Sequence, residues 1–233
     1  MLVAAALCPG PPLLVAGMTG AGTPVTEMRR AALAAVTELA AARPDVVAVV
    51  GAADVTRAWE PDSRLDFAVF APAAGETGLP AGGSTELPTA LGVGAWLLAE
   101  VGYPGRRLLQ SVAAAEPAPR CAEIGAALAA SAPRVAILAM GEGSARRSLK
   151  APGYLDERSA AFDAGVERAV RDGDLRGLLR TDAGLAADLM ATGRPGWQVL
   201  AGAAGDAQAA TEIRYAGDPF GVAYLVASVR LTG

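Results

Sequence analysis

The sequence contains no histidine, and this absence excludes more chemistry than any other feature of its composition. Histidine is the commonest metal ligand in proteins and the usual general base near neutral pH. A Ser-His-Asp site, a Cys-His site and any histidine-based iron or zinc site are therefore excluded. Chemistry in this chain has to use Asp, Glu, Lys, Tyr, Ser, Cys or a bound cofactor.

Cysteine and clustered positive charge are also scarce. The two cysteines, Cys8 and Cys121, are far apart and form neither a disulfide framework nor a metal-binding spacing, which favours a reduced, cytoplasmic protein. The formal net charge is −4 and no basic block occurs. Because nucleic-acid binding needs a clustered basic face, we expect no nucleic-acid partner.

Long hydrophobic runs are missing as well. No apolar stretch approaches the roughly 20 residues that span a bilayer. The apolar run at residues 2–8 is not preceded by Lys or Arg, the first of which is Arg29, and it ends at Pro9, so it does not fit a signal peptide. We therefore expect no membrane partner.

What the sequence does contain is small apolar residues. The chain has 233 residues, of which 52% are hydrophobic but only 5% aromatic, and it includes 28 glycines. This length predicts one domain, residues 1–233, with a sizeable core. The composition predicts a core of small aliphatic side chains on closely packed elements.

The order of apolar patterns predicts an α/β fold with a mainly parallel or mixed twisted sheet and helices on both faces. Continuous or alternating apolar runs predict strands at residues 2–8, 45–51, 65–70, 107–112 and 134–140. Helical spacing predicts helices at residues 26–42, 88–101 and 119–130, a helical region after 155, and a helix at 197–204. Strands at 211–215 and 221–230 predict a C-terminal hairpin. Residues 71–88 form a predicted long loop, of a length that is usually functional or mobile.

Three predicted strand ends carry unusual residues, and ligands in open α/β sheets bind beyond the carboxyl ends of the strands. The first is the turn Cys8-Pro9-Gly10, where a thiol and free backbone can meet a ligand. The alternative is that Cys8 packs as a small hydrophobe before a rigid turn. The second is the segment after the strand at 45–51, where Asp54 and Arg57 follow; Asp54 can be a base, a ligand or a helix cap.

The third strand end has the richest polar cluster, within residues 141–154. Its polar residues are Glu142, Ser144, Arg146, Arg147 and Lys150. Arginine pairs well with carboxylate and phosphate, and glycine permits close approach of the backbone, so the cluster predicts a site for a small anion. The alternative is a solvated loop whose charges pair with Asp156 and Glu157.

Five stretches taken together resemble a known family. They are "ALCPGPPLLV" at 6–15, "RPDVVAVVG" at 43–51, "GEGSARRSLKAPGYLDERSAAFD" at 141–163, "GWQVLAGAA" at 196–204 and "DPFGVAYLVA" at 218–227. They resemble class III extradiol ring-cleavage dioxygenases of the subunit-B type, with particular likeness to an actinobacterial group, and more distantly the Memo-like proteins. The resemblance implies their α/β fold over nearly the whole chain.

The resemblance also implies where a metal site belongs. Members of this family cleave catechol-type rings with O₂, using Fe(II) held by two histidines and a glutamate, plus a catalytic histidine. In this sequence the first ligand position falls on Gly10, the second on Ala53 or Asp54, and the catalytic position on Ala145. Glu212 is a counterpart for the carboxylate ligand, so Asp54 and Glu212 are the weak candidates for a metal, and Fe(II) is expected only if the family activity persists.

These observations lead us to expect a member of this fold without its iron chemistry, that is, a pseudoenzyme or a protein that binds a small anion or an aromatic acid. Two enzymatic alternatives stay open: a dioxygenase with an atypical metal site, and a metal-independent enzyme with Asp54 or Glu142 as its base. A third alternative is an interaction protein, as a homo-oligomer or as one subunit of a complex.

Overall fold

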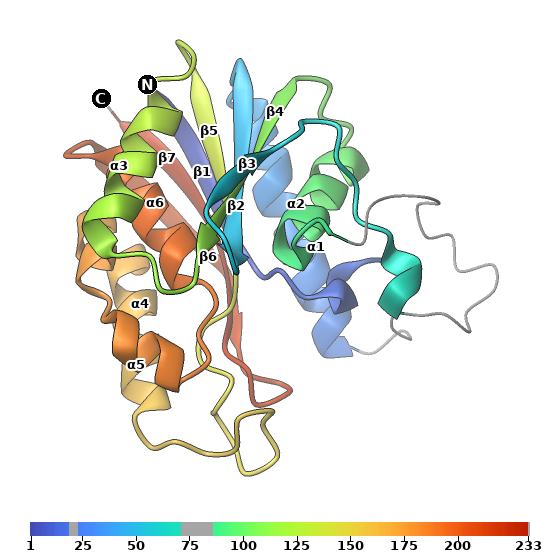
Figure 1. Cartoon of the computed structure of the whole chain (residues 1–233), viewed down its shortest axis with the longest axis vertical. Coiled ribbons are helices and arrows are strands. Elements are labelled where there is room, and N and C mark those ends of the chain that lie inside the picture. Colours follow the sequence, from blue (N-terminus) through green and yellow to red (C-terminus); the bar gives the residue numbers. More distant parts are fainter. Residues whose placement is uncertain (19–22, 71–85, 233) are drawn as a thin grey trace.

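In the computed structural model, seven strands form one mixed sheet between two layers of helices (Figure 1). The structure describes residues 1–18, 23–70 and 86–232. The strands are β1 (Leu2–Cys8), β2 (Val46–Ala53), β3 (Arg57–Trp59), β4 (Arg106–Ala113), β5 (Val135–Met140), β6 (Gln208–Gly217) and β7 (Tyr224–Thr232). Their order across the sheet is β3-β4-β2-β5-β1-β7-β6. The α/β fold and the C-terminal hairpin β6–β7 are therefore confirmed.

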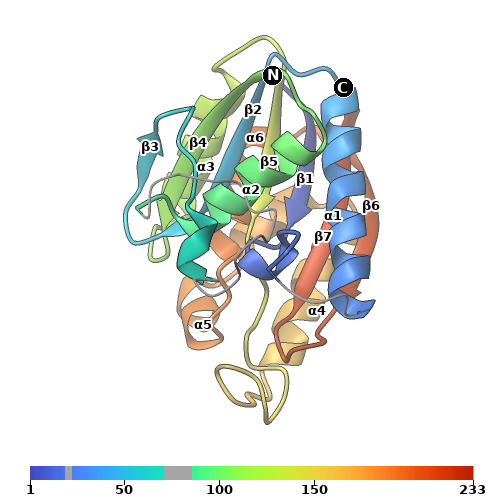
Figure 2. The same ribbon diagram turned by 90° about the vertical axis from the view of Figure 1, so that its right-hand side faces the viewer.

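Helices cover both faces of this sheet, as Figures 1 and 2 show from two sides. The α-helices are α1 (Thr23–Ala41), α2 (Thr89–Glu100), α3 (Ala118–Ala129), α4 (Ser159–Arg171), α5 (Ala183–Asp188) and α6 (Arg194–Ala204). Short 3₁₀ helices are η1 (Pro12–Leu14), η2 (Phe67–Phe70) and η3 (Leu175–Arg180). Helices α1 and α2 pack on one face, while α3, α4 and α6 lie on the other. Within the described part of the chain, no helix is both long and apolar enough to cross a membrane.

The central strands explain why the sheet needs two layers of helices. Successive side chains of a strand point to opposite faces. In β5, Leu138 and Met140 belong to the core under α1 and α2, whereas Ile137 and Ala139 belong to the core under α3 and α6. All six residues of β5 are buried. An apolar run of this kind is stable only when both faces are covered.

Small residues allow helices α3 and α6 to pack very closely. A Cβ placed on Gly125 would lie 2.0 Å from the carbonyl oxygen of Val199, and one on Gly202 would lie 2.2 Å from that of Ala122. Backbone therefore meets backbone at this contact. The composition correctly predicted such close packing, because glycine and alanine leave room for it.

One predicted strand is wrong. Residues 65–70 form no strand; η2 begins at Phe67, and the Asp66 carboxylate accepts a hydrogen bond of 3.0 Å from the backbone N–H of Ala68. Such a local bond offers the backbone an alternative to sheet pairing. The edge strand is instead β3, which pairs antiparallel with β4 and was not predicted. Most of the predicted long loop, residues 71–85, lies outside the described residues.

The strands β4, β2, β5 and β1 are parallel to one another. Their carboxyl ends therefore meet at one edge of the sheet. This edge contains the ends of β1, β2 and β5, the three positions at which the sequence predicts a site.

Candidate functional site

A cavity of about 530 Å³ lies at the carboxyl ends of β1, β2 and β5. We call it the edge cavity; it is lined by residues 10–11, 52–55, 59, 86–90, 140–142 and 192. The lining includes the first residues of α2 and the residue two positions before α6. A cavity in this position matches the usual place of ligands in open α/β sheets.

Glu142 is a polar side chain of the edge cavity that hydrogen bonds hold in place. Its Oε1 accepts a hydrogen bond of 2.6 Å from the backbone N–H of Gly10, and its Oε2 accepts one from the Thr192 hydroxyl. The backbone N–H of Glu142 in turn donates to Thr192 Oγ1 at 3.0 Å. Burial raises the pKa of the Glu142 carboxyl, although these hydrogen bonds act in the opposite direction. The side chain is therefore fixed in place in the wall of the cavity.

The start of α6 is held by a buried arginine, which keeps Thr192 beside Glu142. Arg194 is only 1% exposed; its guanidinium donates to the carbonyl of Ala114 at 2.6 Å and to Oε1 of Gln198 at 2.7 Å. The backbone N–H of Gly193 donates to the carbonyl of Glu142 at 2.8 Å. These bonds tie the end of β4, α6 and the residue after β5 together.

At the first predicted strand end, the turn after β1, neither Cys8 nor Gly10 offers a side chain to a ligand. Cys8 is 1% exposed, does not line the edge cavity, and burial raises the pKa of its thiol to about 12, so it is not a nucleophile. Gly10 lines the cavity through its backbone. A Cβ on Gly10 would lie 2.9 Å from the Cβ of Ala90 in α2, so the space for a side chain is already filled.

The second predicted strand end contributes to the cavity wall. Asp54 lines the edge cavity and is exposed, with no helix following it to cap. Arg57 stacks on the ring of Trp59, 3.5 Å from its centroid, and Trp59 donates to the hydroxyl of Ser111 at 2.9 Å. Trp59 therefore stands as a rigid aromatic wall on β3.

The residues of the predicted anion cluster are not brought together. Glu142 faces the edge cavity, Lys150 is exposed, and Ser144 is buried, with its hydroxyl accepting a hydrogen bond of 3.1 Å from the backbone N–H of Arg146. Arg146 lies against Gly153, and Arg147 faces a different cavity. The edge cavity is lined, among the described residues, by the carboxylates Asp54, Glu86 and Glu142 and by no Lys or Arg.

The residues present do not fit the Fe(II) of the resembling family. Backbone and small side chains stand at Gly10, Ala53 and Ala145, where the resemblance implies imidazoles. Glu212 lies on β6, at the far edge of the sheet from Asp54, and forms an ion pair of 3.0 Å with Arg214. Over residues 1–18, 23–70 and 86–232, no group of three or more Cys, Asp or Glu residues is placed to hold a metal ion.

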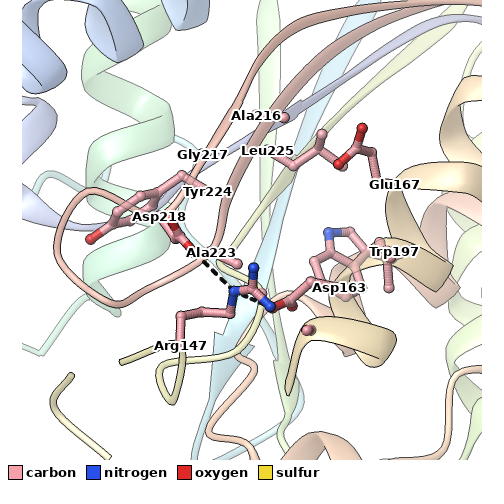
Figure 3. Close-up of a pocket in the computed structure, with 14 residues that line it drawn as sticks. Arg147, Asp163, Glu167, Trp197, Ala216, Gly217, Asp218, Ala223, Tyr224 and Leu225 are labelled. Carbon is pink, nitrogen blue, oxygen red and sulfur yellow. Dashed lines mark hydrogen bonds and ion pairs between the residues drawn. The ribbon is translucent and has the colours of Figure 1, made fainter. Parts of the chain in front are cut away.

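A second cavity, of about 230 Å³, lies between α4, α6 and the turn of the β6–β7 hairpin (Figure 3). We call it the hairpin cavity; it shares no lining residue with the edge cavity. Arg147 Nε donates to Asp218 at 3.0 Å and lies 3.7 Å from Oδ2 of Asp163. The predicted pairing of the loop charges with Asp156 and Glu157 therefore does not include Arg147.

The sequence did not identify Thr192, Trp59 or Asp163 as site residues. Thr192 is 50 positions from Glu142, and Asp163 is 19 positions from Ser144, whose backbone N–H donates to it at 2.8 Å. The only local signal for Thr192 is the Gly193-Arg194-Pro195 start of α6, since proline favours the first turn of a helix.

No protein-family model and no curated protein matches this chain. Among solved structures, the chain is similar to the crystal structure of the uncharacterized protein JW3007 from Escherichia coli K12. The identity is 16% and the TM-score 0.52, and the match covers 98% of this chain and 99% of that chain. A likeness at this level of identity shows a shared fold, and it extends over the whole length of both chains.

Proposed function

We propose that this protein binds a small molecule in the edge cavity, on a fold of the subunit-B-like extradiol type but without its histidine-based Fe(II) site. The observation that supports this most is the position of the Glu142 carboxyl. One backbone donor, Gly10 N–H, and one side-chain donor, the Thr192 hydroxyl, hold it in the wall of a cavity of about 530 Å³. A cavity with a few convergent polar groups is the usual form of a ligand site. The absence of histidine removes the family's iron ligands.

The charges around this cavity favour a neutral or cationic ligand over the anion that the sequence suggested. Three carboxylates and no Lys or Arg are found among its described lining residues. The carboxylates of Asp54 and Glu86 disfavour an anion there, whereas a hydroxyl or ammonium group can donate a hydrogen bond to Asp54. Trp59 supplies an aromatic surface for the apolar or cationic part of such a ligand. Both cysteines are free and buried, in keeping with a reduced, cytoplasmic setting.

The test is to identify what the purified protein carries. Mass spectrometry of the denatured protein's extract should find a neutral or amine-bearing small molecule, and calorimetric titration should show that it rebinds. Glu142→Gln and Thr192→Val should each weaken binding at least about tenfold, equal to about 1.4 kcal/mol. Lys150→Gln, an exposed change on the same loop, is the matched control and should bind as the parent does.

Two results would overturn this proposal. One is an unaltered affinity in both Glu142→Gln and Thr192→Val. The other is one equivalent of iron in the purified protein together with consumption of a catechol, which would restore the dioxygenase alternative.

The raised pKa of Glu142 favours one enzymatic alternative, a metal-independent acid–base catalyst. A carboxyl with a raised pKa keeps its proton to higher pH than an ordinary glutamate and can donate it to a bound substrate. In this case the recovered ligand should change chemically during incubation with the protein, as followed by NMR. Glu142→Gln should abolish that conversion, and a ligand that stays unchanged contradicts catalysis.

A further inference from the structure

The hairpin cavity contains an arginine whose hydrogen-bonding capacity is mostly unused. Arg147 donates from Nε to Asp218, but no acceptor in the described part of the chain takes a hydrogen bond from its two terminal nitrogens. Figure 3 shows the guanidinium directed into the cavity from the loop that follows β5. A guanidinium edge with two free N–H₂ groups matches the two oxygens of a carboxylate.

A second donor faces the same space. Trp197 of α6 is only 3% exposed, and its indole N–H finds no acceptor within the described residues. In Figure 3 the indole nitrogen is turned toward the cavity, across from Arg147. Buried tryptophan N–H groups usually find a partner, so this donor is available to a ligand.

The apolar part of the cavity completes a small site. Ala160 and Ala164 of α4 and Leu225 of β7 are among its apolar lining residues. Asp163 lies beside Arg147, with Oδ1 accepting a hydrogen bond of 2.8 Å from Ser144 N–H. Its Oδ2 is buried and has no hydrogen-bond donor among the described residues. The cavity thus combines two free donors, one incompletely bonded carboxyl and an apolar wall.

We propose that the hairpin cavity is a binding site for a small monocarboxylate, held by the free guanidinium edge of Arg147 and the indole N–H of Trp197. The apolar part of the ligand lies against the alanines of α4 and Leu225. This site is separate from the edge cavity, and it does not depend on the function proposed for that cavity.

The charge balance disfavours a ligand with two negative charges. Arg147 is the one Lys or Arg among the described lining residues, and its Nε already pairs with Asp218, while Asp163 and Glu167 also line the cavity. A phosphate dianion would therefore meet more negative than positive charge. A simple amine would be repelled by the positive charge of the Arg147 guanidinium. The carboxylate oxygen that could accept from it, Oδ2 of Asp163, is buried.

The carboxyl of Asp163 makes binding depend on pH. Burial raises the pKa of Asp163 to about 6, and the hydrogen bond from Ser144 N–H and the nearby Arg147 only partly offset this. The other titratable groups that face it are Arg147 itself, Asp218, which is paired with Arg147, and Glu167, which is paired with Arg171. A protonated Asp163 removes one negative charge beside the ligand. Affinity should therefore rise as pH falls through about 6.

Sodium benzoate is a suitable probe, because it stays ionised above pH 5 and has an apolar body. The intact chain, labelled with ¹⁵N, is titrated at pH 5.5 and at pH 7.5 while the Trp197 indole N–H signal is followed by NMR. Trp197→Phe identifies that signal. We expect a saturable shift at pH 5.5 and an affinity lower by about tenfold or more at pH 7.5, since one pH unit above a pKa lowers the protonated fraction about tenfold.

Three variants separate the roles of the residues. Arg147→Gln should abolish the shift, Asp163→Asn should bind equally at both pH values, and Lys150→Gln, on the same loop but outside the cavity, should match the parent. Sodium phosphate and butylammonium chloride serve as the other ligand classes and should give no saturable shift.

Several outcomes would overturn the proposal. They are the absence of a saturable benzoate shift in the parent protein, equal affinity in Arg147→Gln, equal affinity of the parent at both pH values, and binding of butylammonium or phosphate in place of benzoate. The parent titrations need no variant, so they decide the question even if Arg147→Gln does not fold.

Discussion

The backbone N–H of Gly10 donates a hydrogen bond of 2.6 Å to Oε1 of Glu142, a residue 132 positions further along the chain. The bond joins the turn after β1 to the loop after β5. Since β1 and β5 are neighbours in the sheet, the two strand ends are held at a fixed spacing. The floor of the edge cavity is therefore built from backbone at Gly10 and from a carboxyl at Glu142.

Glu142 should make the stability of the protein depend on pH. Its pKa is raised in the folded state, so the protonated form is favoured by folding, and this contribution is lost as pH rises through the folded-state pKa. The free energy of unfolding of the parent should fall relative to Glu142→Gln as pH rises through the range above 4.5, the ordinary pKa of a glutamate. Urea denaturation at each pH measures the difference, and Asp54→Asn is the exposed control. A constant difference across this range would contradict the raised pKa.

Gly10→Ala should destabilise the protein although it adds only one methyl group. The new Cβ would lie 2.9 Å from the Ala90 side chain and 3.1 Å from its Cα, so α2 has to move. We expect a loss of about 1–3 kcal/mol, the usual cost of overpacking. Thermal and urea denaturation check this loss.

The control for this substitution is Gly165→Ala in α4, where no atom lies within 4 Å of the new Cβ. It should be neutral or stabilise the protein by about 0.5–1 kcal/mol, because alanine is the better helix former. If Gly10→Ala were as stable as Gly165→Ala, the close contact with α2 would be refuted.

Gly202→Ala should have a larger effect than Gly10→Ala. Its Cβ would meet the carbonyl oxygen of Ala122 at 2.2 Å, and backbone atoms cannot rotate away as a side chain can. Helices α3 and α6 would have to separate, which opens the core beneath them. We expect a loss of at least about 3 kcal/mol, as for strongly disruptive core changes. A midpoint of urea unfolding equal to that of the parent would show that the two helices are less closely packed.

Both thiols should be unreactive in the folded protein. Cys8 and Cys121 are buried, and burial raises the pKa of both thiols. Because the thiolate is the reactive form, a thiol-specific reagent such as dithionitrobenzoate should label neither residue in the native state and both in urea. Rapid labelling of Cys8 at neutral pH would contradict its raised pKa and would make Cys8 a candidate nucleophile at the turn after β1.

The sequence predicted the strands whose carboxyl ends form the site, because such strands are recognised from short-range apolar patterns. The β-branched run at 46–50 and the apolar run at 135–140 identify buried parallel strands, whose carboxyl ends must share an edge. Leu65–Phe70 misled the prediction, since its apolar residues serve a 3₁₀ turn held by Asp66.

The sequence could not predict that residues of the loop 141–154 face two different cavities. Adjacent residues Glu142 and Gly143 line different cavities, so a cluster that is compact in sequence is divided in space. Which side each residue faces depends on partners that are distant in the chain, namely Thr192 for Glu142 and Asp163 for the Ser144 backbone. No local periodicity encodes such pairings.

The contact between Gly10 and Ala90 also bears on how this sequence can evolve. An imidazole at position 10 needs space that the side chain of Ala90 occupies, so Gly10→His alone produces a strained protein before it produces a metal ligand. A gain of that ligand requires an earlier change in α2, together with a second imidazole elsewhere in a chain that has none. The packing of Gly10 against Ala90 thus makes these two positions epistatic, because the residue that position 10 tolerates depends on the residue at position 90.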